Sequence, residues 1–143
     1  YTLQERKNKI FAANFNPKFT ENLFFIHLNQ KQDTRKSIEH YKNQNKATLS
    51  SALEKITSIT HQIISCENLL EFNLLLEVHE NVISQLTGLQ KVKTRLFPDY
   101  KGAVKSLGGW GGDFVLATGE INDIEYFKKK GYNTIFPYSK MIL

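Results

Sequence analysis

The chain has 143 residues, which corresponds to one domain. A hydrophobic share of 41% with 12% aromatic residues excludes a disordered chain, and a single cysteine, Cys66, excludes an intrachain disulfide. The net charge is +5 and no apolar run reaches the ~18 residues that span a bilayer, so we expect a cytoplasmic protein without membrane contact.

The charge is distributed unevenly along the chain. Residues 1–46 carry 9 basic and 4 acidic side chains, residues 47–90 carry 1 and 5, and residues 91–143 carry 9 and 5. Two basic ends therefore flank an acidic middle. This distribution suits an anionic partner such as a phosphate or a nucleic acid, and it suits an ordinary solvated surface as well.

The first third of the chain predicts one strand and one helix. Residues 1–22 show no clear period. Residues 23–28 (LFFIHL) form a short apolar run that is typical of a buried strand. After a polar stretch, Asp33 or Thr34 can cap a helix that runs to about Asn45.

Two long helices are predicted next. From Thr48 to Cys66 the apolar residues recur every three or four positions and so share one helical face; they are Leu49, Leu53, Ile56, Ile59 and Ile63. The second helix begins near Glu67–Asn68 and ends at Gly88, a typical C-cap. Its main apolar stripe is Leu69, Phe72, Leu76, His79, Ile83 and Leu86, widened by Leu70, Leu74, Leu75, Val78 and Val82. We therefore expect it to be buried on more than one side and to pack antiparallel to its neighbour.

The last third predicts three strands and a helix. Strands are expected over residues 102–107 and 113–118, joined by the run GGWGG, and over residues 133–138, where Pro137 favours an edge or an end. A lysine-ended helix over residues 121–130 stops before Gly131. Because two strands joined by a tight turn are antiparallel, we predict an α+β fold with an antiparallel sheet covered on one face by helices.

The glycine-rich turn is the most informative motif. Four of the 8 glycines lie within residues 108–112, and a run of exposed backbone N–H groups can bind an anion. No Gly-Lys-Ser/Thr follows, as a Walker A loop requires, and no helix follows, as a dinucleotide-binding loop requires. A plain glycine-rich hairpin explains the spacing equally well, and Trp110 suits either a buried anchor or a ligand contact.

The stretch from Gly102 to Ala117, GAVKSLGGWGGDFVLA, resembles the third conserved motif of the GHMP kinases, which include galactokinase, homoserine kinase, mevalonate kinase and phosphomevalonate kinase. Its Gly-Gly-Asp looks most similar to the phosphomevalonate kinase branch. The matching positions are Lys105, Ser106, Gly108, Gly111, Gly112 and Asp113. Residues 25–34 also look similar to the strand and helix entry that open this domain. Leu107 stands where the family usually has Ser or Thr, and Trp110 replaces a glycine.

The resemblance implies a ferredoxin-like C-terminal domain spanning residues 1–143 of a longer two-domain kinase, as the missing initiator methionine also leads us to expect. The intact enzyme would transfer the γ-phosphoryl group of ATP to a hydroxyl or phosphate acceptor such as mevalonate or phosphomevalonate. ATP, Mg²⁺ and the catalytic residues would be held mainly by the N-terminal domain, so this chain alone is not expected to be active.

The resemblance also implies a substrate and phosphate site at the turn. Its members are Lys105, Ser106, Gly108, Gly109, Gly111, Gly112 and Asp113. Lys105 or Lys31 would supply positive charge, and Asp113 would fix the turn. The expected partners are a small-molecule substrate and the N-terminal kinase domain; a homodimer stays open, and nucleic acid is not expected.

Other chemistry finds little support. The four histidines, His27, His40, His61 and His79, do not have zinc-site spacing, so no metal site is predicted. His79 lies on an apolar stripe and fits a core or boundary histidine whose hydrogen bonds are satisfied, and Cys66 fits a buried, inert thiol. The alternative function is a non-catalytic α+β module that binds a protein or nucleic acid through its basic ends, with strongly salt-dependent affinity.

Overall fold

The computed structural model describes residues 2–4, 9–30, 42, 46–108 and 112–141, and for 2–4, 9–11 and 46–48 it describes the backbone alone. The helix expected to end near Asn45 therefore lies almost entirely outside the described residues. So do the tip of the glycine turn, residues 109–111, and Lys31.

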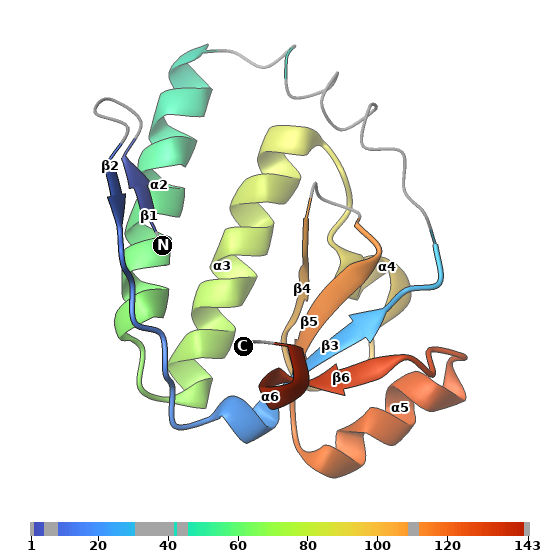
Figure 1. Ribbon diagram of the computed structural model, residues 1–143. Helices are drawn as coiled ribbons and strands as arrows, with labels where there is room; N and C mark the ends of the chain where they lie inside the picture. Colours follow the sequence, from blue (N-terminus) through green and yellow to red (C-terminus); the bar gives the residue numbers. More distant parts are fainter. Residues whose placement is uncertain (1, 5–8, 31–41, 43–45, 109–111, 142–143) are drawn as a thin grey trace.

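The element order follows the predicted order closely (Figure 1). The elements are β1 (Thr2–Gln4), β2 (Lys9–Phe11), η1 (Thr20–Asn22), β3 (Leu23–His27), α2 (Lys46–Ser65), α3 (Leu69–Thr87), α4 (Val92–Leu96), β4 (Val104–Ser106), β5 (Phe114–Thr118), η2 (Ile121–Asp123), α5 (Ile124–Lys129), β6 (Ile135–Pro137) and α6 (Tyr138–Met141). The four predicted strands, the two long helices and the lysine-ended helix are confirmed. The β1–β2 ribbon and the short helices η1, α4 and α6 carry no clear sequence signal and were missed.

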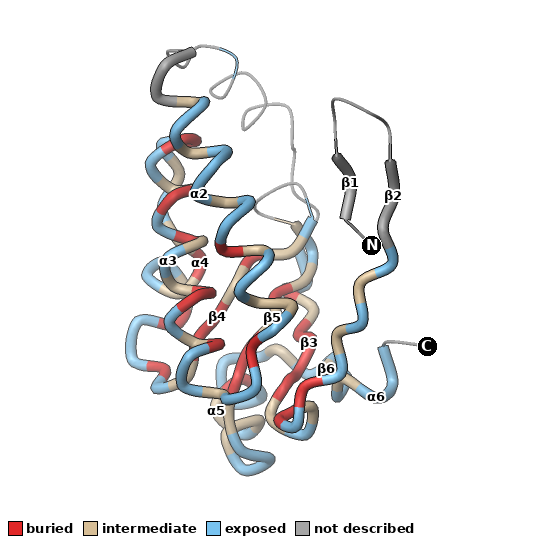
Figure 2. Tube along the Cα trace, turned by 90° about the vertical axis from the view of Figure 1, so that its left-hand side faces the viewer, coloured by how far each residue is buried: buried red, intermediate tan, exposed pale blue. Residues whose placement is uncertain are grey.

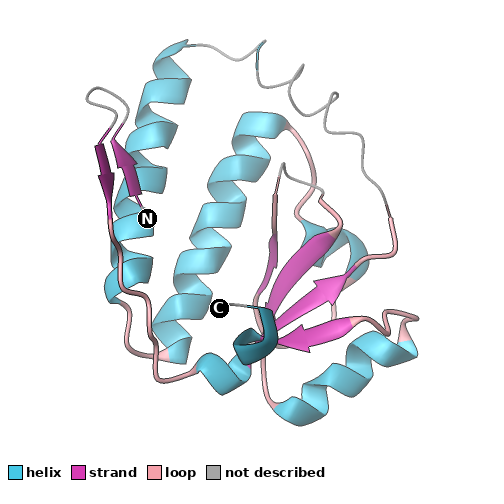
Figure 3. Ribbon diagram, viewed as in Figure 1, coloured by secondary structure: helices cyan, strands magenta, loops and turns pink. Residues whose placement is uncertain are grey.

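Four strands form one antiparallel sheet in the order β4-β5-β3-β6 (Figure 3). β3 lies in the interior, with Phe25 opposite Leu116 of β5 and Phe136 of β6. β4 and β5 are neighbours in sequence and pair with Lys105 opposite Leu116. β6 is an edge strand that ends at Pro137, as predicted, because proline cannot donate a ladder hydrogen bond.

Helices α2 and α3 lie side by side and run antiparallel (Figure 1). The start of α3 is fixed by the side chain of Asn68, which accepts a hydrogen bond of 2.8 Å from the backbone N–H of Glu71. Its end is fixed by Gly88, whose φ of 67° is the left-handed conformation that favours glycine. Both boundaries match the sequence prediction.

The prediction that α3 is buried on more than one side is wrong at three positions. Leu70 and Leu74 are 73% and 61% exposed, and Val78 is also exposed. These residues recur every four positions and so share one face of α3, a helix on which buried and exposed positions alternate (Figure 2). Leu53 of α2 is likewise exposed.

The prediction that helices cover one face of the sheet is also wrong. One core cluster joins α2 and α3 to Leu23 and Leu116, whereas a second joins α4 and α5 to Ile26 and Val115. Neighbouring residues on a strand point to opposite faces, so the two clusters lie on opposite sides of the sheet. The physical reason is that four consecutive β3 residues, 23–26, are apolar and buried, and a strand of this kind needs cover on both faces.

The second cluster is built on aromatic rings. Phe97 is fully buried, and its ring centroid lies 5.1 Å from that of Phe127 and 5.3 Å from that of Tyr132, both in edge-to-face geometry. Tyr100 packs against Phe127 and donates a hydrogen bond of 2.9 Å to the carbonyl oxygen of Thr118. This cluster attaches α5 to the sheet. Among the described helices, none has the length and apolar character needed to cross a bilayer.

Candidate functional site

Residues 107–113 connect β4 to β5, and the structure describes the two ends of this connection, 107–108 and 112–113. The backbone N–H of Leu107 donates a hydrogen bond of 3.1 Å to the carbonyl oxygen of Phe114, which closes the hairpin. Gly108 has a φ of +68° with open space around it. A Cβ added to Gly112 would lie 2.3 Å from the carbonyl oxygen of Leu107, so only glycine fits there without a shift of the backbone. Gly109, Trp110 and Gly111 lie outside the described residues.

Lys105 lies in the middle of β4 and points toward α3. Its Nζ is 3.4 Å from Oε1 of Glu80 and donates a hydrogen bond of 3.2 Å to the carbonyl oxygen of Ser106. The side chain of Lys105 is only 18% exposed, and that of Glu80 is 1% exposed. Burial lowers the pKa of the Lys105 ammonium, while the charge of Glu80 and its hydrogen bond raise it again. The hairpin base therefore contains a buried ion pair.

His79 lies beside this ion pair on α3. Burial, and then the positive charge of Lys105, lower the pKa of His79 to about 4, so its imidazole is neutral at physiological pH. Its Nδ1 atom is buried and has no hydrogen-bond partner among the described residues. The boundary position predicted for His79 is confirmed, but the expectation that its polar atoms are satisfied is wrong at Nδ1 among the described residues.

The structure also describes Ser106 and Asp113, two further site residues that the sequence predicts. Ser106 is buried and, as the next residue on β4, points to the opposite face of the sheet. Asp113 is exposed, and its carbonyl oxygen accepts a hydrogen bond of 2.7 Å from the N–H of Leu28. The backbone of Asp113 thus ties the end of the turn to Leu28, the residue directly after β3.

Sequence reasoning missed Glu80 as a site residue. Glu80 lies 25 positions from Lys105 in the sequence. Within its helix it is one of several glutamates. One feature of the sequence indicated Glu80. It directly follows His79 of the apolar stripe, at a position that the helical period places toward the sheet. The pairing with Lys105 follows from how α3 docks against β4, which no local pattern reveals.

Cys66 is a free cysteine at the end of α2. The residue is buried, and its Sγ donates to the carbonyl oxygen of Asn68 at 3.2 Å. Burial raises the pKa of the thiol, with a further contribution from the nearby charge of Glu71. Across the described residues, no three His, Cys, Asp or Glu side chains form a group that could hold a metal ion.

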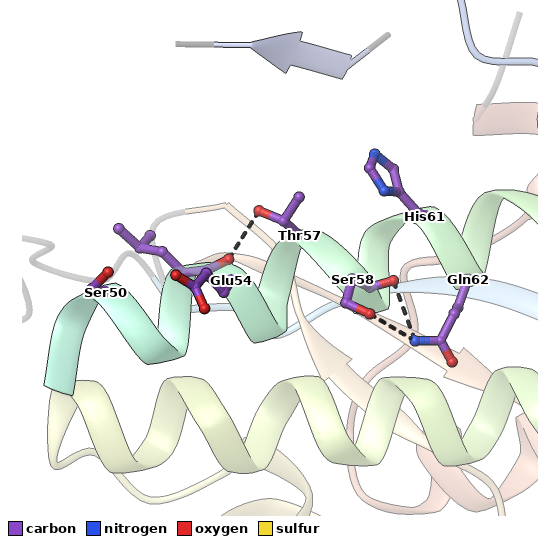
Figure 4. A pocket seen from close by; sticks show the side chains of 7 residues that line it. Ser50, Glu54, Thr57, Ser58, His61 and Gln62 are labelled. Atoms are coloured by element: carbon purple, nitrogen blue, oxygen red, sulfur yellow. Dashed lines mark hydrogen bonds between the residues drawn. The ribbon is translucent and has the colours of Figure 1, made fainter. Parts of the chain in front are cut away.

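A groove of about 680 Å³ lies along α2, away from the hairpin (Figure 4). Its lining is mostly polar and comprises Ser50, Leu53, Glu54, Thr57, Ser58, His61 and Gln62. Much of this polarity is used within the helix: the Thr57 hydroxyl donates to the carbonyl oxygen of Leu53 at 2.9 Å, and the Gln62 amide donates to Ser58. All of the lining residues belong to α2, so the groove lies along a single helix.

No model of a known protein family matches this chain, and the search of curated proteins finds no match either. The hypothesis of a GHMP-type kinase therefore depends on the residues of the β4–β5 hairpin and on the order of the strands in the sheet.

Proposed function

We propose that this chain is the C-terminal portion of an ATP-dependent small-molecule kinase of the GHMP type. The intact enzyme transfers the γ-phosphoryl group to a hydroxyl or phosphate acceptor, with mevalonate and phosphomevalonate as the first candidates. The observation that carries the proposal is the β4–β5 hairpin, whose turn begins and ends on glycines and has the buried Lys105 at its base.

The sheet topology supports this proposal. Counting from β3, one strand is followed by helices, two strands, a helix and a last strand, in the order β4-β5-β3-β6. This is the strand order of the ferredoxin-like arrangement that the resemblance implies. The helices α4 and α5 on the second face are a departure from its one-sided form.

The chemistry of the hairpin suits a phosphate group. Phosphoryl transfer depends mainly on positioning the phosphates and neutralising their charge. The open space around Gly108 lets a ligand approach the backbone there, and the ammonium group of Lys105 contacts the carbonyl oxygen of Ser106, directly before the turn. ATP supplies the phosphoryl group when bound, but we assign no described residue to its adenine or to Mg²⁺.

A substrate screen tests this function. The full-length protein that contains this sequence is incubated with γ-labelled ATP and a panel of isoprenoid intermediates, sugars and homoserine. The expected result is ATP-dependent labelling of one acceptor, and loss of labelling in a Lys105→Met variant that keeps its fold. If no acceptor is labelled and ATP does not bind, the kinase proposal is wrong. Binding of nucleic acid that weakens steeply with salt would favour the non-catalytic alternative instead.

A further inference from the structure

A cavity of about 440 Å³ lies at the turn that joins α2 to α3. One wall is formed by residues 14 and 16–18, in the segment that runs past this turn in Figure 1, and the other by residues 64–67. A volume of this size is within the range of small-molecule sites. Since a helix rises about 1.5 Å per residue, the start of α3 at Leu69 is roughly 16 Å along the helix axis from Glu80. The cavity is therefore separate from the β4–β5 hairpin.

Aromatic rings hold the first wall in place. The ring centroids of Phe15 and Phe19 lie 6.0 Å and 5.0 Å from that of Phe72, a buried residue of α3. Positions 14, 16 and 18, which stand beside and between these anchors, are exposed. The segment is thus fixed to the core while it presents polar side chains to the cavity. A wall that is already ordered lowers the entropic cost of binding a ligand.

The polar side chains of the cavity have capacity for further bonds. Among the described residues, no hydrogen bond engages the side-chain amides of Asn14 and Asn16. The Nζ atom of Lys18 lies 3.5 Å from Oε2 of Glu67, and the two side chains are 84% and 80% exposed. An ion pair exposed to this degree contributes little to stability. Both charges are therefore available to a ligand at a small cost.

We propose that this cavity binds a small zwitterion, an α-amino acid with a polar side chain, whose carboxylate contacts Lys18 and whose ammonium group contacts Glu67. An anion or a cation alone would be attracted by one of these residues and repelled by the other. A zwitterion complements both, and it replaces one exposed ion pair with two charge-assisted hydrogen bonds. The amides of Asn14 and Asn16 supply donors and acceptors for the polar side chain of the ligand. This site goes beyond the proposed kinase function and does not depend on it.

Calorimetric titration of the full-length protein with L-glutamine, L-asparagine and L-serine tests the proposal. We expect at least one of them to bind at a single site. N-acetyl-L-glutamine lacks the ammonium group and L-glutaminamide lacks the carboxylate, so each should bind about tenfold or more weakly than L-glutamine, because each loses one hydrogen bond between charged groups.

Two variants assign the binding to this cavity. Lys18→Met and Glu67→Gln should each weaken the binding of L-glutamine about tenfold or more while the protein stays folded, since the pair they remove is exposed. Lys18→Met should not weaken the binding of L-glutaminamide further, and Glu67→Gln should not weaken that of N-acetyl-L-glutamine further. Glu125→Gln is the matched control, because Glu125 forms an exposed pair with Lys128 on α5, and it should leave the affinity unchanged.

Each contrary result has a definite meaning. If none of the three amino acids binds, the proposal is wrong. If L-glutamine and its two blocked forms bind equally well, the ligand is not recognised as a zwitterion and the proposal is wrong. If Lys18→Met and Glu67→Gln behave like Glu125→Gln, the amino acid binds elsewhere and this cavity is excluded. The kinase proposal survives each of these failures, since none of the three variants lies in the β4–β5 hairpin.

Discussion

At the scale of single residues, the backbone of the turn explains its glycines. Gly108 adopts a positive φ, and Gly112 lies so close to the carbonyl oxygen of Leu107 that a side chain is sterically excluded. The two glycines thus serve different purposes, one conformational and one steric. The sequence predicted a glycine-dependent turn from composition, and the structure separates these two reasons.

Replacing Gly112 by alanine should destabilise the protein by about 1–3 kcal/mol, because the new methyl group must displace the backbone at Leu107. The matched control is Gly108→Asn, which adds a side chain into open space at a φ that asparagine tolerates, and it should cost less than about 1 kcal/mol. Urea unfolding of both variants measures the difference. Equal midpoints for Gly112→Ala and the wild type would contradict the steric explanation.

At the scale of elements, the sequence of α3 predicts more burial than the structure shows. Its composition is apolar enough for burial on several sides, but only the faces toward α2 and the sheet have neighbours. Phe72, Leu75 and Leu76 lie in the core, whereas Leu70, Leu74 and Val78 face away from it. Periodicity identifies the helix and one buried face, and the number of covered faces depends on what packs around it.

Two leucines on α3 therefore differ in their contribution to stability. Leu76→Ala should cost about 2–5 kcal/mol, because it leaves a cavity between α3 and the sheet at a position that is 2% exposed. Leu74→Ala, at a position that is 61% exposed, should change stability by about 0.5 kcal/mol or less. Urea unfolding followed by circular dichroism measures both. A large cost for Leu74→Ala would show that this side chain is covered in solution.

At the scale of the whole molecule, the sheet separates two cores and α3 carries the polar contacts to it. The hydroxyl of Thr118 donates to Asn73 at 2.6 Å, and Lys105 pairs with Glu80, which lies about two helical turns further along the same face of α3. His79 is neutral and half-buried at the same helix–sheet boundary. The attachment of α3 to the sheet therefore depends on the protonation state of His79, Glu80 and Lys105.

Acidification should weaken this attachment through His79. Its pKa in the folded protein is about 4, below the usual value of 6.5, so the unfolded chain binds the proton more tightly. Stability is therefore lost as pH falls from about 6.5 toward 4, and His79→Gln should remove this part of the loss. Urea unfolding between pH 7 and pH 4 compares the two proteins, with the exposed His61→Gln as control. Parallel pH profiles for wild type and His79→Gln would refute the assignment.

The sequence by itself determined the local elements. The period of apolar residues gives α2 and α3, Asn68 and Gly88 mark the ends of α3, and the glycine run makes β4 and β5 an antiparallel pair. These features are predictable because they depend on residues within one or two turns of each other. The short helix α4 and the β1–β2 ribbon lack such a signal, since each has too few residues to show a period.

Only the tertiary structure decided which of these elements meet. It placed α4 and α5 on the second face of the sheet, turned Ser106 away from Lys105, and brought Glu80 of α3 to the base of the hairpin. Such pairings join residues far apart in sequence, and they depend on the angle and depth at which a helix docks on a sheet. A local pattern fixes which residues share a face, but the partner opposite that face is set by the packing of the whole chain.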